Sequence, residues 1–150
     1  MRRLTFLTAL FAALLSVFAL TGTASANPSA TTTKVYAVSG ASTAAGCAVQ
    51  LNNGPVGYAI CGTDATYMGF NDGTERLFVI GTDHAVWNIV EYPNGTQSGW
   101  RSLGGWLQIG VYRYIYDARY AYDLEIWSYG RDGAAWCRAL HSSWGAWHHC

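Results

Sequence analysis

Two stretches of the sequence repeat one another: LFVIGTDHAVW at residues 77–87 and IWSYGRDGAAW at residues 126–136. They align without gaps at a constant offset of 49 positions, which pairs Gly81 with Gly130, Asp83 with Asp132, Ala85 with Ala134 and Trp87 with Trp136. Further along, SGWRSL at 98–103 matches GAWHHC at 145–150 and places Trp100 on Trp147. A period of about 40 to 50 residues with strand–turn–strand content is typical of a β-propeller blade.

The strands of this repeat carry apolar residues on both faces. In residues 85–91, Ala85, Trp87 and Ile89 point one way, while Val86 and Val90 point the other way. A sheet with one wet face alternates cleanly between apolar and polar residues, whereas a blade between two neighbouring blades does not. We therefore predict an all-β fold, a partial β-propeller with two to three antiparallel blades of about 49 residues.

The repeat also sets the expected domain organisation. The two clear blades are expected at about 71–105 and 120–150, and residues 34–70 are expected to form a degenerate third unit. All three belong to a single predicted domain over residues 34–150.

The segment from Met1 to Ala26 is set apart from this domain. A positively charged start, an apolar run over residues 4–20 and the small-residue site Ala24-Ser25-Ala26 form the layout of a secretory signal peptide. Residues 27–33 are small, polar and Pro-containing, which indicates a flexible leader. We expect an extracellular, secreted protein that has no membrane segment once the signal is cleaved.

Composition narrows the choice of partner. Removing the signal takes away Arg2 and Arg3 and leaves seven basic residues against nine acidic ones. A weakly acidic chain without Lys/Arg clusters argues against nucleic acid and anionic membranes as partners. Aromatic content points elsewhere, because every tryptophan of the chain lies at or after Trp87.

Four cysteines lie in the exported part, and an even number in an oxidising compartment favours two disulfides with three possible pairings. Two short apolar runs flank a turn at Asn52–Gly54, and a hairpin about this turn places Cys47 opposite Cys61. The tail can fold in the same way and bring Cys137 near Cys150. The predicted bridges are therefore Cys47–Cys61 and Cys137–Cys150.

The motif around the repeat resembles that of a known family. A strand ending in Gly-x-Asp-x-Ala-x-Trp and followed by GWRSLGG at 99–105 looks like the repeat of the PLL-type, seven-bladed bacterial β-propeller lectins and their tectonin-like relatives. The best copy runs from Leu77 to Gly105, and a more divergent copy runs from Leu124 to Cys150. The resemblance implies a lectin that binds small sugars such as fucose in pockets between consecutive blades.

The chain departs from this family in the number of blades. Family propellers close a ring, and closure removes exposed sheet edges. Two to three blades do not close a ring by themselves. The sequence leaves three outcomes open: a homo-oligomer that completes the ring, an open stack protected by disulfides, or a fragment of a larger propeller.

Exposed indole rings are good platforms for the apolar face of a sugar. Trp87 and Trp136 lie in mid-strand, recur with the repeat and are interpreted as core residues. Trp100 and Trp147 enter a strand beside a loop, so core and ligand roles stay open for both. Trp106 and Trp144 are the better exposed candidates, and with Trp100 and Trp147 they make up the tryptophans of the candidate ligand site.

Polar candidates for the same site lie on the turns. Asp83 and Asp132 follow a glycine between two strands, where an aspartate commonly binds its own turn backbone. His84 and Arg131 flank these aspartates, so a loop-borne sugar site is expected to draw on them.

Other activities are less well supported by the sequence. A glycosidase needs two carboxyl groups about 5 to 9 Å apart, and the nine acids lie mostly at turns or strand ends, Glu75 among them. His148 and His149 are adjacent, so on a strand they point to opposite faces and do not favour a metal site. We therefore expect no catalytic residue, metal or cofactor. The leading prediction is a carbohydrate-binding module, with a protein-interaction or assembly module as the alternative and a secreted hydrolase third.

Overall fold

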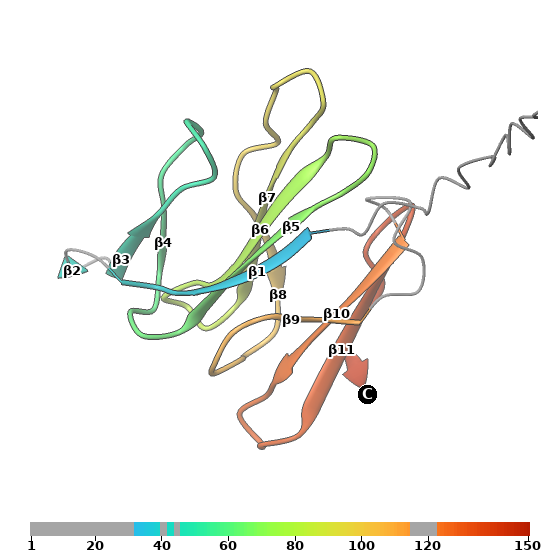
Figure 1. Cartoon of the computed structure of the whole chain (residues 1–150). Coiled ribbons are helices and arrows are strands. Elements are labelled where there is room, and N and C mark those ends of the chain that lie inside the picture. The colour runs from blue at the N-terminus through green and yellow to red at the C-terminus, as the bar shows by residue number, and fades with distance from the viewer. Residues whose placement is uncertain (1–31, 40–41, 44–45, 115–122) are drawn as a thin grey trace, which may run out of the picture.

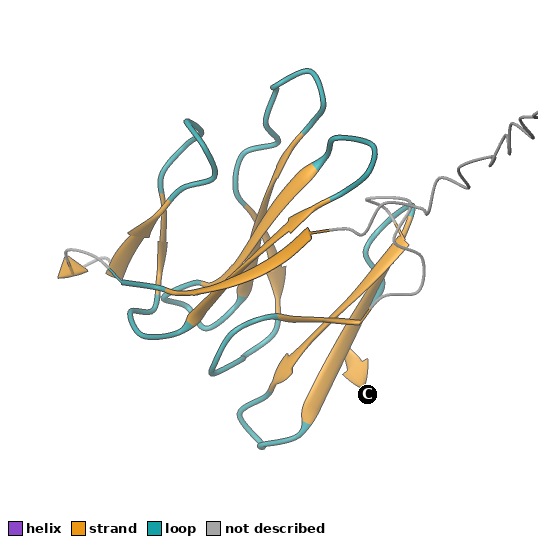
Figure 2. Ribbon diagram, in the orientation of Figure 1, coloured by secondary structure: helices purple, strands orange, loops and turns teal. Residues whose placement is uncertain are grey.

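A computed structural model describes residues 32–39, 42–43, 46–114 and 123–150. The described residues contain strands and turns only (Figure 2), so no helix capable of crossing a membrane occurs among them. The predicted signal peptide and most of the predicted leader lie outside this part of the chain. The predicted all-β fold class is confirmed.

A five-stranded sheet occupies the centre of the molecule (Figure 1), with the strand order β1-β5-β6-β7-β8 and every pair antiparallel. Its strands are β1 (Thr32–Ala37), β5 (Asp64–Gly69), β6 (Glu75–Ile80), β7 (Val86–Glu91) and β8 (Arg101–Gly104). The strand β1 starts at Thr32, within the segment expected to be a leader. Both β1 and β5 precede Asn71, where the first of the two clear blades was expected to start, yet both belong to the central sheet.

Two smaller antiparallel sheets flank the central one (Figure 1). The C-terminal sheet has the order β12-β11-β10-β9, and the N-terminal sheet has the order β2-β3-β4. The C-terminal strands are β9 (Tyr112–Tyr114), β10 (Asp123–Tyr129), β11 (Ala135–His141) and β12 (His148–His149). The N-terminal strands are β2 (Ser42–Thr43), β3 (Gly46–Val49) and β4 (Gly57–Ala59).

The core forms two layers, one on each face of the central sheet. Successive residues of β6 alternate between the layers: Leu77 and Val79 face the N-terminal sheet, whereas Phe78 and Ile80 face the C-terminal sheet. The N-terminal layer includes Val38, Cys47, Leu51, Ala59, Ala65 and Ile89; the C-terminal layer includes Met68, Val86, Leu103, Leu107, Val111, Leu124, Ile126 and Leu140. Each face of the central sheet thus packs against another sheet, as the apolar residues on both faces of the predicted blade indicated.

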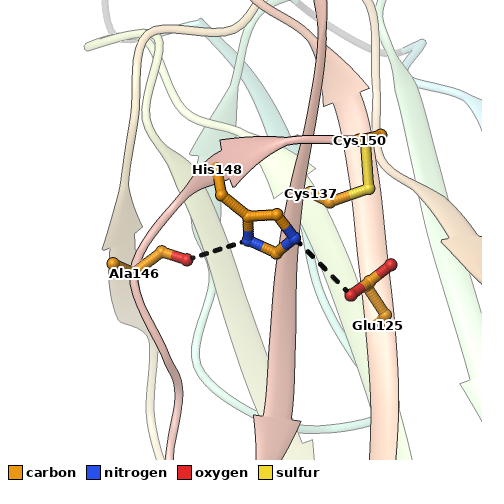
Figure 3. A network of polar contacts seen from close by, with 5 residues as sticks. All are labelled: Glu125, Cys137, Ala146, His148 and Cys150. Atoms are coloured by element: carbon orange, nitrogen blue, oxygen red, sulfur yellow. Dashed lines mark hydrogen bonds and ion pairs between the residues drawn. A yellow bond between two sulfur atoms is a disulfide. The ribbon is translucent and has the colours of Figure 1, made fainter.

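Both predicted disulfides are present. Cys47–Cys61 and Cys137–Cys150 each span a Cα–Cα distance of 5.1 Å. The second bridge ties the short strand β12 to β11, and His148 lies beside it with its Nε2 3.9 Å from Oε2 of Glu125 (Figure 3). Each flanking sheet is therefore cross-linked by one disulfide, whereas the central sheet is stabilised by apolar packing against a flanking sheet on each face.

The three sheets follow one another without closing a ring, which is consistent with a partial propeller (Figure 1). The repeat is visible in three dimensions as well. Ala59 bridges Gly81 at the junction of the first two sheets, and Leu107 bridges Gly130 at the junction of the next two. The same connection is thus made twice, about one repeat apart.

Candidate functional site

The Gly-x-Asp turn of each repeat fixes one tryptophan. Oδ1 of Asp132 accepts hydrogen bonds from the backbone N–H of Ala134 at 3.0 Å and from Nε1 of Trp136 at 3.1 Å. Asp83 accepts the equivalent bonds from Ala85 at 3.1 Å and from Trp87 at 3.0 Å. The aspartate thus caps its own turn, as the sequence indicated, and also orients the indole four residues later.

The glycine of the turn makes room for that indole. A Cβ atom on Gly130 would lie 2.6 Å from Cδ1 of Trp136, and one on Gly81 would lie 2.5 Å from Cδ1 of Trp87. Real Cβ atoms do not approach other heavy atoms so closely, so only glycine allows the ring to lie over the turn. Glycine, aspartate and tryptophan therefore act as one structural unit.

A cavity of about 590 Å³ opens at this unit in the second repeat, and we call it the Trp106 pocket. Gly105, Trp106 and Leu107, which follow the last strand of the central sheet, form one wall. The β10–β11 turn and two tryptophans form the other. The full lining is Gly105, Trp106, Leu107, Gly130, Arg131, Asp132, Trp136 and Trp147.

Trp106 is the most exposed tryptophan of this pocket, with 43% of its surface accessible. His84 stacks on its ring at a centroid distance of 4.0 Å and an angle of 16°, and the Arg131 guanidinium lies 5.2 Å from the ring centroid. His84 is anchored from behind, because its carbonyl accepts from the N–H of Leu107 at 2.9 Å and its Nδ1 lies 3.2 Å from the Leu107 carbonyl.

The opposite wall is held by the C-terminal tail. Nε1 of Trp147 donates to the carbonyl of Leu103 at 2.9 Å, which ties the tail to the central sheet. Trp136 meets His149 edge to face at a centroid distance of 4.1 Å. Both indoles also pack against the C-terminal core layer, so their positions are set before any ligand arrives.

Two neighbouring residues, Asp132 and Arg131, carry the charge of the pocket, and they differ in their hydrogen bonding. Hydrogen bonds from Ala134 and then from the Trp136 indole lower the pKa of Asp132 below its ordinary value of 3.8, so this carboxylate stays ionised at neutral pH. Arg131 is exposed, and its guanidinium makes no hydrogen bond to the described residues. The pocket therefore offers unused donors beside an ionised acceptor.

A second cavity, of about 340 Å³, lies at the equivalent place in the first repeat, and we call it the Trp100 pocket. Trp87, Trp100, Asp83 and Thr82 occupy the positions of Trp136, Trp147, Asp132 and Arg131. The remaining lining is Val56, Gly57, Tyr58, Val79 and Gly81. Nε1 of Trp100 donates to the carbonyl of Pro55 at 2.9 Å, just as Trp147 donates to Leu103.

The candidate residues chosen from sequence divide between these pockets. Trp106, Trp147, Arg131 and Asp132 line the first, Asp83 and Trp100 line the second, and His84 supports Trp106 from behind. Trp144 lies outside both. It is half-buried, packs against the C-terminal core layer and meets Phe78 edge to face at a centroid distance of 6.1 Å.

Sequence reasoning misses several wall residues. It assigns Trp87 and Trp136 to the core alone, yet each packs against a core layer and also lines a pocket. It does not single out Tyr58 at all. A signal exists, because GYAICG at 57–62 matches GWLQIG at 105–110 in its glycines and in the aromatic residue that follows the first.

The strongest pair of acids for a hydrolase lies away from both pockets. Glu75 and Glu91 are directly opposite on β6 and β7, and Nδ2 of Asn52 lies 2.9 Å from Oε2 of each. The amide of Asn52 occupies the space between the two carboxyl groups, where a glycosidase holds the scissile bond. Within the described ranges, no group of three or more His, Cys, Asp or Glu residues is arranged to hold a metal ion.

Neither a protein-family model nor a curated protein matches this sequence.

Proposed function

We propose that this protein is a secreted, lectin-like module that binds a small sugar such as fucose in the Trp106 pocket. The observation that carries the proposal is a preformed cavity between consecutive sheets that combines three indoles, an ionised carboxylate and a guanidinium that makes no hydrogen bond to the described residues. This combination suits a hexose, because one face of a hexose is apolar and its rim carries hydroxyl groups. The resemblance of the repeat to β-propeller lectins supports the same assignment.

Each wall has a role in this scheme. The rings of Trp136 and Trp147 supply apolar surface for the carbon face of the sugar. Arg131 donates to hydroxyl oxygens. Oδ2 of Asp132, whose only hydrogen bond within the described part of the chain is a 3.2 Å contact from the Trp136 indole, accepts from a hydroxyl group. Trp106 closes the pocket and holds the guanidinium in place.

Secretion is part of the proposal. Two disulfides indicate folding in an oxidising compartment, and the segment from Met1 to Ala26 has the layout of an export signal.

The test is a panel of monosaccharides titrated by isothermal calorimetry against the wild-type chain and three variants. We expect at least one sugar to bind with a ratio of one per chain. Arg131→Ala and Trp147→Ala should each weaken binding by about tenfold, which corresponds to the loss of one charged hydrogen bond or one ring contact. Trp100→Ala, the matched change in the other pocket, should leave sugar affinity unchanged. Absence of binding across the panel would refute the proposal.

An assembly role is a second candidate because of strand β1. All six of its residues are exposed, and it forms one edge of the central sheet, where Val35 and Tyr36 are each about half accessible. Exposed edges recruit further strands. Light scattering on the purified chain decides this point: a defined oligomer supports assembly, and a monomer that binds sugar leaves the lectin role alone.

A further inference from the structure

The Trp100 pocket has a different chemistry from its counterpart, although the same repeat builds it. Its aromatic wall consists of Tyr58, Trp87 and Trp100, and its charged group is Asp83. Among the described residues, neither a lysine nor an arginine contributes to the lining. The cavity therefore combines aromatic rings with one negative charge.

The indole donors of this pocket are already used within the protein. Nε1 of Trp87 donates to both oxygens of Asp83, at 3.0 and 3.2 Å, and Nε1 of Trp100 donates to the Pro55 carbonyl at 2.9 Å. What these two residues offer a ligand is ring surface. The other side-chain donors of the lining are the Thr82 and Tyr58 hydroxyl groups, so the Trp100 pocket lacks the charged donor that Arg131 supplies in the Trp106 pocket.

In the Trp106 pocket, a cation accompanies the aromatic wall and the carboxylate. There, the Arg131 guanidinium lies 5.2 Å from the Trp106 ring centroid, beside Asp132. The repeat places Thr82 at the position of Arg131, and the Gly-aromatic match places Tyr58 at that of Trp106. One pocket thus carries an internal cation over its aromatic wall, and the other has the wall and the carboxylate without the cation.

We propose that the Trp100 pocket binds a small quaternary ammonium group, for which choline is the probe. A cation over aromatic rings is attracted by their negative faces, and this attraction grows when the site is shielded from water. The methyl groups fit the apolar lining of Val56 and Val79, and Asp83 supplies the counter-charge. The site and the ligand class differ from those of the sugar proposal, so either proposal can fail without the other.

The first experiment titrates wild-type protein with choline chloride by isothermal calorimetry, against sodium chloride at matched ionic strength. We expect saturable binding of one choline per chain. Its neutral carbon analogue, 3,3-dimethyl-1-butanol, should bind at least about tenfold more weakly, since it keeps the shape and loses the charge. Equal binding of the two ligands, or no saturable choline binding, would overturn the proposal without the need for any variant.

Variants then locate the site. Thr82→Arg should copy the internal cation of the other pocket and abolish choline binding, while the sugar response of the Trp106 pocket stays unchanged. The reciprocal change, Arg131→Thr, should create a second choline site and raise the ratio from one to two. Asp83→Asn keeps the acceptor for Trp87 and removes the charge, so it should weaken binding by about tenfold, whereas Asp132→Asn should have no effect. Choline binding that survives both Thr82→Arg and Asp83→Asn would place the site elsewhere and refute the proposal.

Discussion

Asp132 accepts hydrogen bonds from the backbone of its own turn and from the indole of Trp136, so one carboxylate shapes the turn and orients a pocket wall. The recurrence of glycine, aspartate and tryptophan in the sequence predicted a turn, and an aspartate at such a place commonly caps it. The indole bond was not predictable, because it requires the ring to fold back over Gly130 and no spacing rule describes that contact. Recurrence of a residue reports that it has a role but does not distinguish a core role from a pocket role.

Replacing Gly130 by alanine tests this unit. The new Cβ atom would lie 2.6 Å from the Trp136 ring, so the indole must move and lose its bond to Asp132. We expect a loss of about 1–3 kcal/mol in the free energy of unfolding, measured in urea by tryptophan fluorescence. Gly145→Ala is the control, since its Cβ would meet only the Ala139 carbonyl at 3.6 Å and should leave stability unchanged. Equal stability of the two variants would contradict this account of the motif.

The Asp132–Trp136 bond also predicts a pH dependence. The bonds from Ala134 and Trp136 lower the folded-state pKa of Asp132, so their stabilising contribution is complete above 3.8 and is lost as the pH falls through the lower, folded value. The indole N–H resonance of Trp136, followed by NMR, should therefore titrate with a midpoint below 3.8. Asp132→Asn should remove this titration. A midpoint at or above 3.8 would show that the carboxylate is not engaged in this way.

Among the strands, equivalent positions of the two repeats are held by different interactions, a disulfide in one and a side-chain hydrogen bond in the other. Cys137 in β11 is bonded to Cys150, whereas its counterpart Asn88 in β7 donates from Nδ2 to the carbonyl of Arg101 at 3.2 Å. The hairpin turns predicted both disulfides, because each turn brings its two cysteines near one another. The expected opposition is not exact: Cys47 pairs with Ala59 and Cys137 with His148, and the bonded cysteine lies two residues beyond each partner. Residues 34–37 of β1 lie in the unit expected to be β structure, but the start of the strand at Thr32 and its place in the central sheet were not predicted, for a physical reason. All six of its residues are exposed, so no apolar pattern marks it, and the backbone partner in β5 is invisible to sequence periodicity.

Removing one disulfide at a time should separate stability from binding. Changing Cys137 and Cys150 together to alanine should cost about 3 kcal/mol in the chain-entropy account. It should also weaken sugar binding, because β12 is paired with β11 at only two positions and Trp147 directly precedes it. Changing Cys47 and Cys61 together should cost a similar amount of stability and leave the sugar affinity unchanged. Chemical denaturation and calorimetry at low temperature measure both effects, and equal loss of sugar affinity in the two variants would contradict the assigned position of the site.

In the molecule as a whole, the three sheets lie in a row (Figure 1). Each junction between them carries a pocket at the same place in the repeat. The resemblance to propeller lectins implied a pocket between consecutive blades. Trp106 was a candidate from the sequence, but its position in one wall with Gly105 and Leu107 was not predictable, because that wall depends on how the connection crosses from one sheet to the next. The two pockets differ in charge because equivalent positions carry different residues, such as Arg131 in one and Thr82 in the other.

Sugar binding in the Trp106 pocket can be measured directly from the indole N–H resonances of the seven tryptophans in a ¹H–¹⁵N NMR spectrum, while fucose and a panel of other monosaccharides are added. We expect a saturable shift of the Trp106, Trp136 and Trp147 resonances with at least one sugar, while the resonance of Trp144, which lies outside both pockets, does not shift. If no sugar moves these three resonances, or if the shifts are confined to other tryptophans, the Trp106 pocket is not a carbohydrate site.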